Sequence, residues 1–235
     1  MGSFLLKSFT IDSGSFCMDS LQASSTTIAK FKVLSEELCE LIEQEGFVIR
    51  PYSQDSLPYF RQLSEAEQQS AVENLENYIK ICDSVHEAGG KIKDASLFVR
   101  KALEFYGYQY DAKVLELIQD EYLTEIYNLA NIQLFRTFSY FQYASYTVED
   151  IYTRPWIHLY ERDPQVTAKL VTTLTSIITG EKKSMEIDVE EHLLIEKASL
   201  ERLAVSVRVL YALPLLKEGK TDAYLVVARC KPILN

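Results

Sequence analysis

One short segment of this sequence combines a histidine with two carboxylates. His158, Glu161 and Asp163 lie close together in the chain, and such side chains act as general acids and bases when a fold turns them toward one substrate. An enzyme acting on a small molecule is therefore one interpretation of the segment. No nucleophile with an adjacent base accompanies these residues, so the sequence predicts no catalytic residue and favours a protein that is not an enzyme.

Two further motifs match ligand sites only in part. Gly180–Ser184 ends like a phosphate-binding loop, but it lacks the upstream glycine and the spacing of that motif. His192 follows two glutamates, yet no second histidine lies at the helical spacing that a zinc site needs. We interpret the first as a solvated turn and the second as a surface histidine at a strand end, so no metal site is predicted.

Aromatic residues crowd the segment 135–160. They are Phe135, Phe138, Tyr140, Phe141, Tyr143, Tyr146, Tyr152, Trp156 and Tyr160. Aromatic rings dominate the packing of cores, which is one interpretation of this density. Several buried tyrosine hydroxyls would all need hydrogen-bond partners, however. The other interpretation is a mainly apolar cavity with a few polar groups, the kind of space in which small ligands bind.

Caps and periodicity predict the helices that position these aromatics. Thr147 and Asp150 have the spacing of a capping box, so a short helix should begin there and end before Pro155. Asp163 followed by proline predicts the start of a longer helix over 164–179, which has one apolar stripe and ends at Gly180.

After Gly180 the apolar residues alternate with polar ones, which is the spacing of strands. The segments 185–190, 203–211 and 224–228 show this pattern, and 217–220 is a polar turn of hairpin length. The segment 126–135 can supply one or two more strands before the short helices. We therefore expect an antiparallel sheet in this half of the chain.

Four helical stripes precede that sheet. They begin at Ile28, after Ser64, after Asp94 and after Asp111, and the last runs to Ile126. Residues 1–27 are rich in serine and lack periodicity, as expected of a flexible tail. The predicted fold is α+β, with a helical bundle and its connecting helix over 28–126 followed by a sheet domain over 127–235.

The order of short helices, one longer helix and three antiparallel strands resembles the PAS family of sensory domains. PAS sequences often read N-x-x-F-x-x-x-x-G-Y-S-x-E-E-L-x-G-x-P before the long helix. The C-terminal half matches this pattern at Tyr146, Glu149 and Pro155, replaces it conservatively at Thr147, Asp150 and Ile151, and lacks its asparagine and both glycines.

The resemblance implies a sensory or regulatory module that binds a small molecule or a protein partner and passes a shift to the N-terminal helices. It also implies that the segment around Trp156 lies over the inner face of the sheet. The candidate ligand-binding residues are Tyr140, Tyr143, Trp156, His158, Val205, Val207 and Val226. Haem would require His158 to turn inward as an axial ligand. Flavin photochemistry is disfavoured because no cysteine lies between Cys82 and Cys230.

The alternative is a structural protein-interaction module whose PAS-like half only dimerises. In the resembled family, a helix entering the sheet often serves dimerisation and signalling. Leu117, Leu123 and Leu129 would widen the apolar face of a helix over 111–126. We therefore expect a homodimer, with a downstream regulatory protein as a further partner.

Charge and cysteine content limit the remaining partners. The formal net charge is −10 and no basic cluster offsets it, which argues against nucleic acid or an anionic membrane as the main partner. No apolar run is long enough to span a bilayer. The four cysteines are far apart and form no C-x-x-C pair, so we expect reduced thiols in a cytoplasmic protein.

Overall fold

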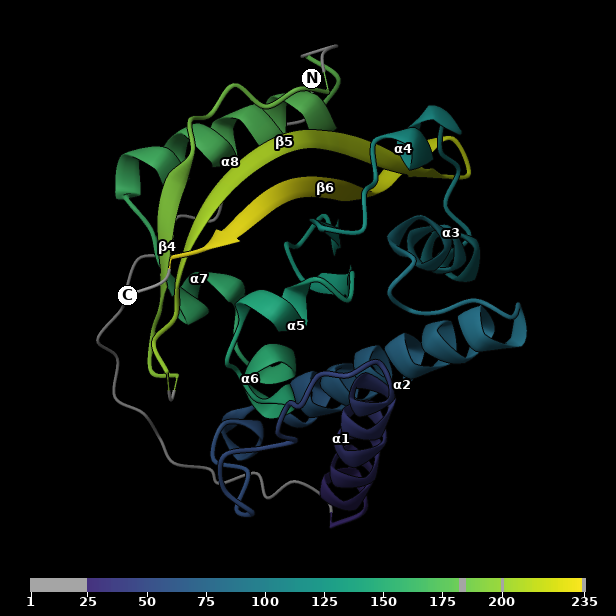
Figure 1. The fold of residues 1–235 in the computed structure, drawn as a ribbon, viewed down its shortest axis with the longest axis vertical. Helices are drawn as coiled ribbons and strands as arrows, with labels where there is room; N and C mark the ends of the chain where they lie inside the picture. Colours follow the sequence, from purple (N-terminus) through teal and green to yellow (C-terminus); the bar gives the residue numbers. More distant parts are fainter. Residues whose placement is uncertain (1–24, 182–184, 200, 234–235) are drawn as a thin grey trace.

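The computed structural model describes residues 25–181, 185–199 and 201–233, and these form an α+β fold (Figure 1). An N-terminal helical region precedes a curled antiparallel sheet with flanking helices, as the sequence predicts. Six strands make up this sheet within the described residues, in the order β2-β1-β6-β5-β4-β3. In Figure 1 the long strands β5 and β6 curve across the molecule, with α1 and α2 at the opposite end of the view from α8.

The elements have the following bounds. The helices are α1 Ser25–Gln44, the 3-10 turn Phe60–Gln62, α2 Glu65–Glu87, α3 Ala95–Tyr106, α4 Lys113–Glu116, α5 Tyr140–Tyr143, α6 Val148–Thr153, α7 Trp156–Leu159 and α8 Pro164–Ile178. The strands are β1 Tyr122–Asn128, β2 Gln133–Arg136, β3 Tyr160–Glu161, β4 His192–Glu196, β5 Ala204–Lys217 and β6 Lys220–Pro232.

Side-chain caps set the starts of α2, α3, α6 and α8, as predicted. The capping boxes Ser64–Glu67 and Thr147–Asp150 both form, each with its two reciprocal hydrogen bonds. The carboxylate of Asp163 accepts hydrogen bonds from the first amides of α8, and Gly180 ends that helix with a φ of 76°, a conformation that glycine adopts without strain.

The predicted helix over 111–126 is wrong beyond its first turn. Only α4 is helical there, and the chain then enters β1. The residues of β1 include Tyr122, Thr124 and Ile126, which favour strands, and all seven residues of this strand pair with β6. The wide apolar helix face expected for a dimer does not form. Instead, Leu123 lines an internal cavity and Leu129 lies exposed after β1.

The central hairpin of the sheet is β5–β6. Glu218 and Gly219 form its two-residue turn with φ values of 52° and 75°, and Lys217 pairs with Lys220. Positive φ at both central positions is the geometry that matches the twist of a hairpin. The predicted turn over 217–220 is therefore confirmed, as are the strands expected between 126 and 135.

A bulge in β5 reverses the alternation, so that odd-numbered residues lie on one face of the sheet before it and on the other face after it. The register shifts between Val209 and Tyr211. Before the bulge, Val205, Val207 and Val209 pack on one face, whereas Tyr211 packs on the other face. The expectation that the alternation runs unbroken from 203 to 211 is wrong at its last residue, because an extra residue in a strand reverses the alternation.

The segment 185–190 is extended but is not the strand that its alternation predicts. It makes a single bridge, Glu186 to Tyr211, beside the bulge. The flanking hydrogen bonds run from Ile187 N to Leu210 O (2.9 Å) and from Ala212 N to Met185 O (2.9 Å). A bulge interrupts a ladder, so pairing stops there. The strand beside β5 is instead β4, although Ile187 and Val189 are buried as expected.

The two faces of the sheet belong to two hydrophobic clusters. The first cluster joins α1, α2 and α3 to the strand residues Ile126, Phe135, Leu213, Leu215, Leu225 and Val227. The second lies on the other face, where α8 contributes Leu170 and Ile177 above the valines of β5 and β6. The helical region and the sheet therefore share one continuous core on the first face.

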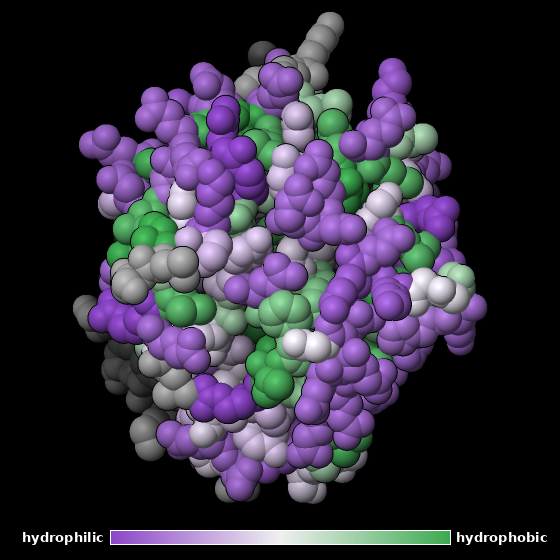
Figure 2. Space-filling view, viewed as in Figure 1, coloured by the Kyte–Doolittle hydropathy of each residue, from purple (hydrophilic) through white to green (hydrophobic). Residues whose placement is uncertain are grey.

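Hydrophilic residues cover most of the face shown in Figure 2, and hydrophobic ones gather there only in small groups. None of the helices that the structure describes is long and apolar enough to cross a bilayer.

Glu149 connects α6 to the segment that precedes α2 through hydrogen bonds. Its Oε1 accepts hydrogen bonds from the N–H groups of Tyr59 (2.9 Å) and Phe60 (3.0 Å). Its Oε2 is buried and has no partner among the described residues. Burial raises the pKa of Glu149 above its usual value, although the two amides oppose this shift.

We therefore expect Glu149→Gln and Glu149→Ala to behave differently. The glutamine keeps an oxygen for both amides and removes a buried charge, so the free energy of unfolding at pH 8 should equal or exceed that of the wild type. The alanine leaves both amides unsatisfied and should cost about 2–4 kcal/mol. Urea unfolding of both variants measures these changes.

Comparing the wild type with Glu149→Gln should also reveal a pH dependence of the free energy of unfolding. Because the folded pKa of Glu149 lies above the unfolded one, folding takes up a proton between the two values, and stability falls as pH rises through that window. The wild type should therefore gain stability relative to Glu149→Gln when the pH is lowered from 8 to about 4.5, the ordinary pKa of a glutamate. An unchanged difference between the two proteins at both pH values would contradict this assignment.

Candidate functional site

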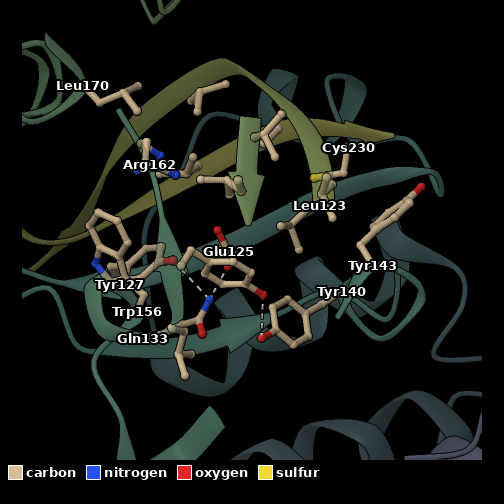
Figure 3. Close-up of a pocket in the computed structure, with 18 of the residues that line it drawn as sticks. Leu123, Glu125, Tyr127, Gln133, Tyr140, Tyr143, Trp156, Arg162, Leu170 and Cys230 are labelled. Atoms are coloured by element: carbon tan, nitrogen blue, oxygen red, sulfur yellow. Dashed lines mark hydrogen bonds between the residues drawn. The ribbon is translucent and has the colours of Figure 1, made fainter. Parts of the chain in front are cut away.

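A cavity of about 130 Å³ lies between the second face of the sheet, α8 and the short helices (Figure 3). Its walls come from all six strands and from α5, α7 and α8. Most of the lining is apolar: Leu123, Leu159, Leu170, Val171, Leu174, Leu194, Val205, Val207, Val209, Val226 and Ala228. This size is comparable to an apolar cavity that holds benzene.

Six of the seven candidate ligand-binding residues meet at this cavity. Tyr140, Tyr143, Trp156, Val205, Val207 and Val226 all line it. They come together because α5 and α7 lie over the face of the sheet to which the valines point. His158 is the exception, since its side chain is exposed and does not line the cavity. The inward position that a haem ligand would require at His158 is not observed.

The three acid–base residues of the segment 158–163 lie outside the lining of the cavity. Both His158 of α7 and Glu161 of β3 are exposed. Asp163 uses its carboxylate to cap α8, where Oδ1 accepts from the N–H groups of Gln165 (2.7 Å) and Val166 (3.2 Å). None of these three side chains therefore faces the apolar cavity.

Glu125 brings a carboxylate to the cavity, and sequence reasoning missed it. The side chain of Gln133 donates a hydrogen bond to Glu125 Oε1, and the same Nε2 lies 3.2 Å from the hydroxyl of Tyr127. Burial raises the pKa of Glu125, while Arg136, the two hydrogen-bonding neighbours and Arg162 oppose this shift. Glu125 and Gln133 are drawn side by side in Figure 3.

Arg162 is the one cation in the lining that the structure describes. Its guanidinium carbon lies 5.1 Å from the ring centroid of Trp156, within cation–π range. Its Nε is buried and has no hydrogen-bond partner among the described residues. Burial lowers the pKa of Arg162, and Tyr127 and Glu125 oppose the shift, although an arginine stays charged at neutral pH.

Four of the tyrosine hydroxyls beside the cavity, those of Tyr127, Tyr140, Tyr160 and Tyr224, have hydrogen-bond partners, as expected of buried tyrosines. Tyr160 donates to the hydroxyl of Tyr140 at 3.2 Å, and Tyr224 donates to Asn131 Oδ1 at 2.6 Å. Burial raises the pKa of the Cys230 thiol to about 12, so this cysteine stays protonated and contributes an apolar surface.

His192 lies at the start of β4 and is half-buried, so the interpretation as a surface histidine is wrong in part. It pairs with Val207 and therefore shares the face of the sheet that the cavity occupies. Its Nδ1 lies 3.0 Å from Glu190 O, and its Nε2 is buried without a partner among the described residues. Burial lowers the pKa of His192.

A second hollow, of about 590 Å³, lies outside this wall. Trp156, Tyr160, Arg162 and Val171 line both spaces, so they separate the cavity from the surface hollow. Val171 is 46% exposed.

The fold and the site together define an α+β protein with a mainly apolar cavity that has a few charged and polar groups in its wall. No group of three or more His, Cys, Asp or Glu side chains among the described residues is placed to hold a metal ion. Comparison of the chain with models of known families, with curated proteins and with solved structures finds no significant match.

Proposed function

We propose that this protein is a sensory or regulatory module that binds a small molecule in the cavity. The observation that carries the proposal is the wall of this space, which is apolar except for Glu125, Gln133, Arg162 and a few tyrosines. Binding sites for small molecules have this composition. The order of two strands, short helices, one longer helix and antiparallel strands also agrees with the PAS resemblance.

A chain of contacts connects the cavity to the N-terminal helices, which a sensory module needs. Arg136 is adjacent to Phe135 in β2 and pairs with Glu125 of the cavity wall. Its carbonyl accepts a hydrogen bond from the buried Tyr78 hydroxyl of α2 (2.9 Å). A shift of β1 or β2 on ligand binding would therefore reach α2. A homodimer and a downstream regulatory protein remain parts of the proposal, although the helix face that motivated the dimer does not form.

The second candidate is an interaction module with no ligand. The observation that favours it is the volume, because about 130 Å³ lies below the roughly 300–1,000 Å³ of common ligand sites. In that case the cavity is a packing defect.

Trp156 distinguishes the two candidates because it is the only tryptophan in the sequence and it lines the cavity. We expect the purified protein to release a small molecule on mild unfolding, and the emission of Trp156 to change after refolding without it. Emission spectra and mass analysis of the released material measure both effects. Identical spectra, with nothing released, favour the interaction module.

A further inference from the structure

Two arginines and one carboxylate lie at the polar end of the cavity. Arg162 lines it. Arg136, which is 3% exposed, pairs with Glu125 across β1 and β2, and its guanidinium carbon lies 4.9 Å from the ring centroid of Tyr140 and 5.4 Å from that of Tyr152. Glu125 is the only acidic residue in the described lining. Among the described residues, none of these three side chains forms an ion pair within 4 Å.

This arrangement leaves a surplus of positive charge in a poorly solvated place. The charges of Arg136 and Arg162 both act on the one carboxylate, Glu125, and burial raises the pKa of Glu125, so its negative charge is itself disfavoured there. Buried charges are costly unless they are paired and hydrogen-bonded. The Nε atoms of Arg136 and Arg162 both lack a hydrogen-bond partner among the described residues. The wall therefore offers donors and positive charge in excess of its acceptors.

We infer that the cavity binds a small monocarboxylate, with the carboxylate toward Arg162 and an apolar body against Leu170, Val207 and Val226. A guanidinium presents several N–H donors in one plane, which suits a carboxylate better than other anchoring groups do. The volume limits the apolar body to about the size of a benzene ring. This inference rests on the proposed function, because it names the class of molecule that the cavity takes.

Three probes of nearly equal size test the headgroup. Benzoate carries a carboxylate, benzamide replaces it with a neutral amide, and benzylamine carries a cation. The readout is the single indole N–H resonance of Trp156 in a titration followed by ¹H–¹⁵N NMR, which gives a dissociation constant without relying on any activity. We expect benzoate to bind at least about tenfold more tightly than benzamide, and benzylamine more weakly than both.

Arg162→Met tests the residue. It keeps an unbranched apolar side chain but removes the charge, so the affinity for benzoate should fall at least about tenfold while that for benzamide changes little. The matched control is Arg208→Met, which removes an exposed cation from the middle of β5 and should leave both affinities unchanged. Arg162→Lys serves if the methionine variant does not fold, and it should weaken benzoate binding while sparing benzamide.

The outcomes separate this inference from the proposed function. Equal binding of benzamide and benzoate, or tighter binding of benzylamine, overturns the carboxylate while leaving a ligand-binding cavity. An unchanged benzoate affinity in both Arg162 variants overturns the role of that residue. Binding of none of the probes overturns the inference, and the release experiment on the purified protein then decides the proposed function separately.

Discussion

Replacing Glu196 with alanine should lower the free energy of unfolding by about 3–5 kcal/mol. Glu196 is fully buried at the end of β4. Its Oε1 accepts from the N–H of Ser145 (2.7 Å), and its Oε2 accepts from the Ser145 hydroxyl (2.6 Å), the Ser199 hydroxyl (2.7 Å) and the N–H of Leu203 (3.0 Å). The alanine would leave both amides without an acceptor and open a cavity.

Two further variants define the cause of that loss. Glu196→Gln keeps the volume, but in either orientation its NH₂ group faces one of the two amide N–H donors, so it should still cost about 1–3 kcal/mol. Glu201→Ala removes an exposed carboxylate from the same loop and should change stability by less than about 0.5 kcal/mol. Equal stability of Glu196→Ala and Glu201→Ala in urea unfolding would show that the network does not hold this loop.

Phe135→Ala is expected to cost about 3–5 kcal/mol. The ring of Phe135 is 1% exposed and lies 4.7 Å from that of Phe98 in α3 and 5.7 Å from that of Tyr78 in α2, measured between centroids. Because it belongs to the cluster shared by helices and sheet, its loss should lower the stability of both regions together. Circular dichroism for the helices and Trp156 emission for the sheet should then report coincident denaturant transitions.

The control for this variant is Phe105→Ala in α3. Its ring is 42% exposed, so the substitution should cost much less than the loss of Phe135. Two separate transitions in the Phe135 variant would contradict a continuous core, because they would show that the helical region unfolds independently of the sheet.

The parts of the fold that could be predicted from the sequence are those that neighbouring residues decide. The capping boxes, the proline at the start of α8 and the Glu218-Gly219 turn all depend on contacts within a few residues. Such contacts form wherever the chain goes, so their residue types are informative on their own. For the same reason the helix over 164–179 is confirmed almost to the residue.

The errors arise where distant pairing decides the outcome. The segment 117–126 has apolar residues at spacings that suit a helix, yet its pairing with β6 makes part of it a strand. The bulge in β5 and the bridge at Glu186 depend on how three segments meet. The residue types on either side of Leu210 do not predict that the strand has a bulge there.

Three aromatic residues and three valines of the cavity wall could be predicted from the sequence, but the residues from α8 and the polar end of the wall could not. Tyr140, Trp156 and the valines stand out as aromatic or alternating residues. Glu125 could not be predicted to line the cavity because its segment, 111–126, is predicted to be a helix. Read as a strand, that segment places Leu123, Glu125 and Tyr127 on one face, which would have pointed the carboxylate into the cavity.

Strand β6 lies between β1 and β5, and its Leu225 and Val227 cover the helical region. During synthesis the helices α1 to α3 and strand β1 emerge well before that strand does. Until it arrives, the apolar faces of the helices lack part of their cover and β1 has an unpaired edge, a state that is open to aggregation and to proteases. Folding of this protein should therefore be limited by closure of contacts between segments far apart in the chain, and it should be slow compared with that of a helical bundle of similar size.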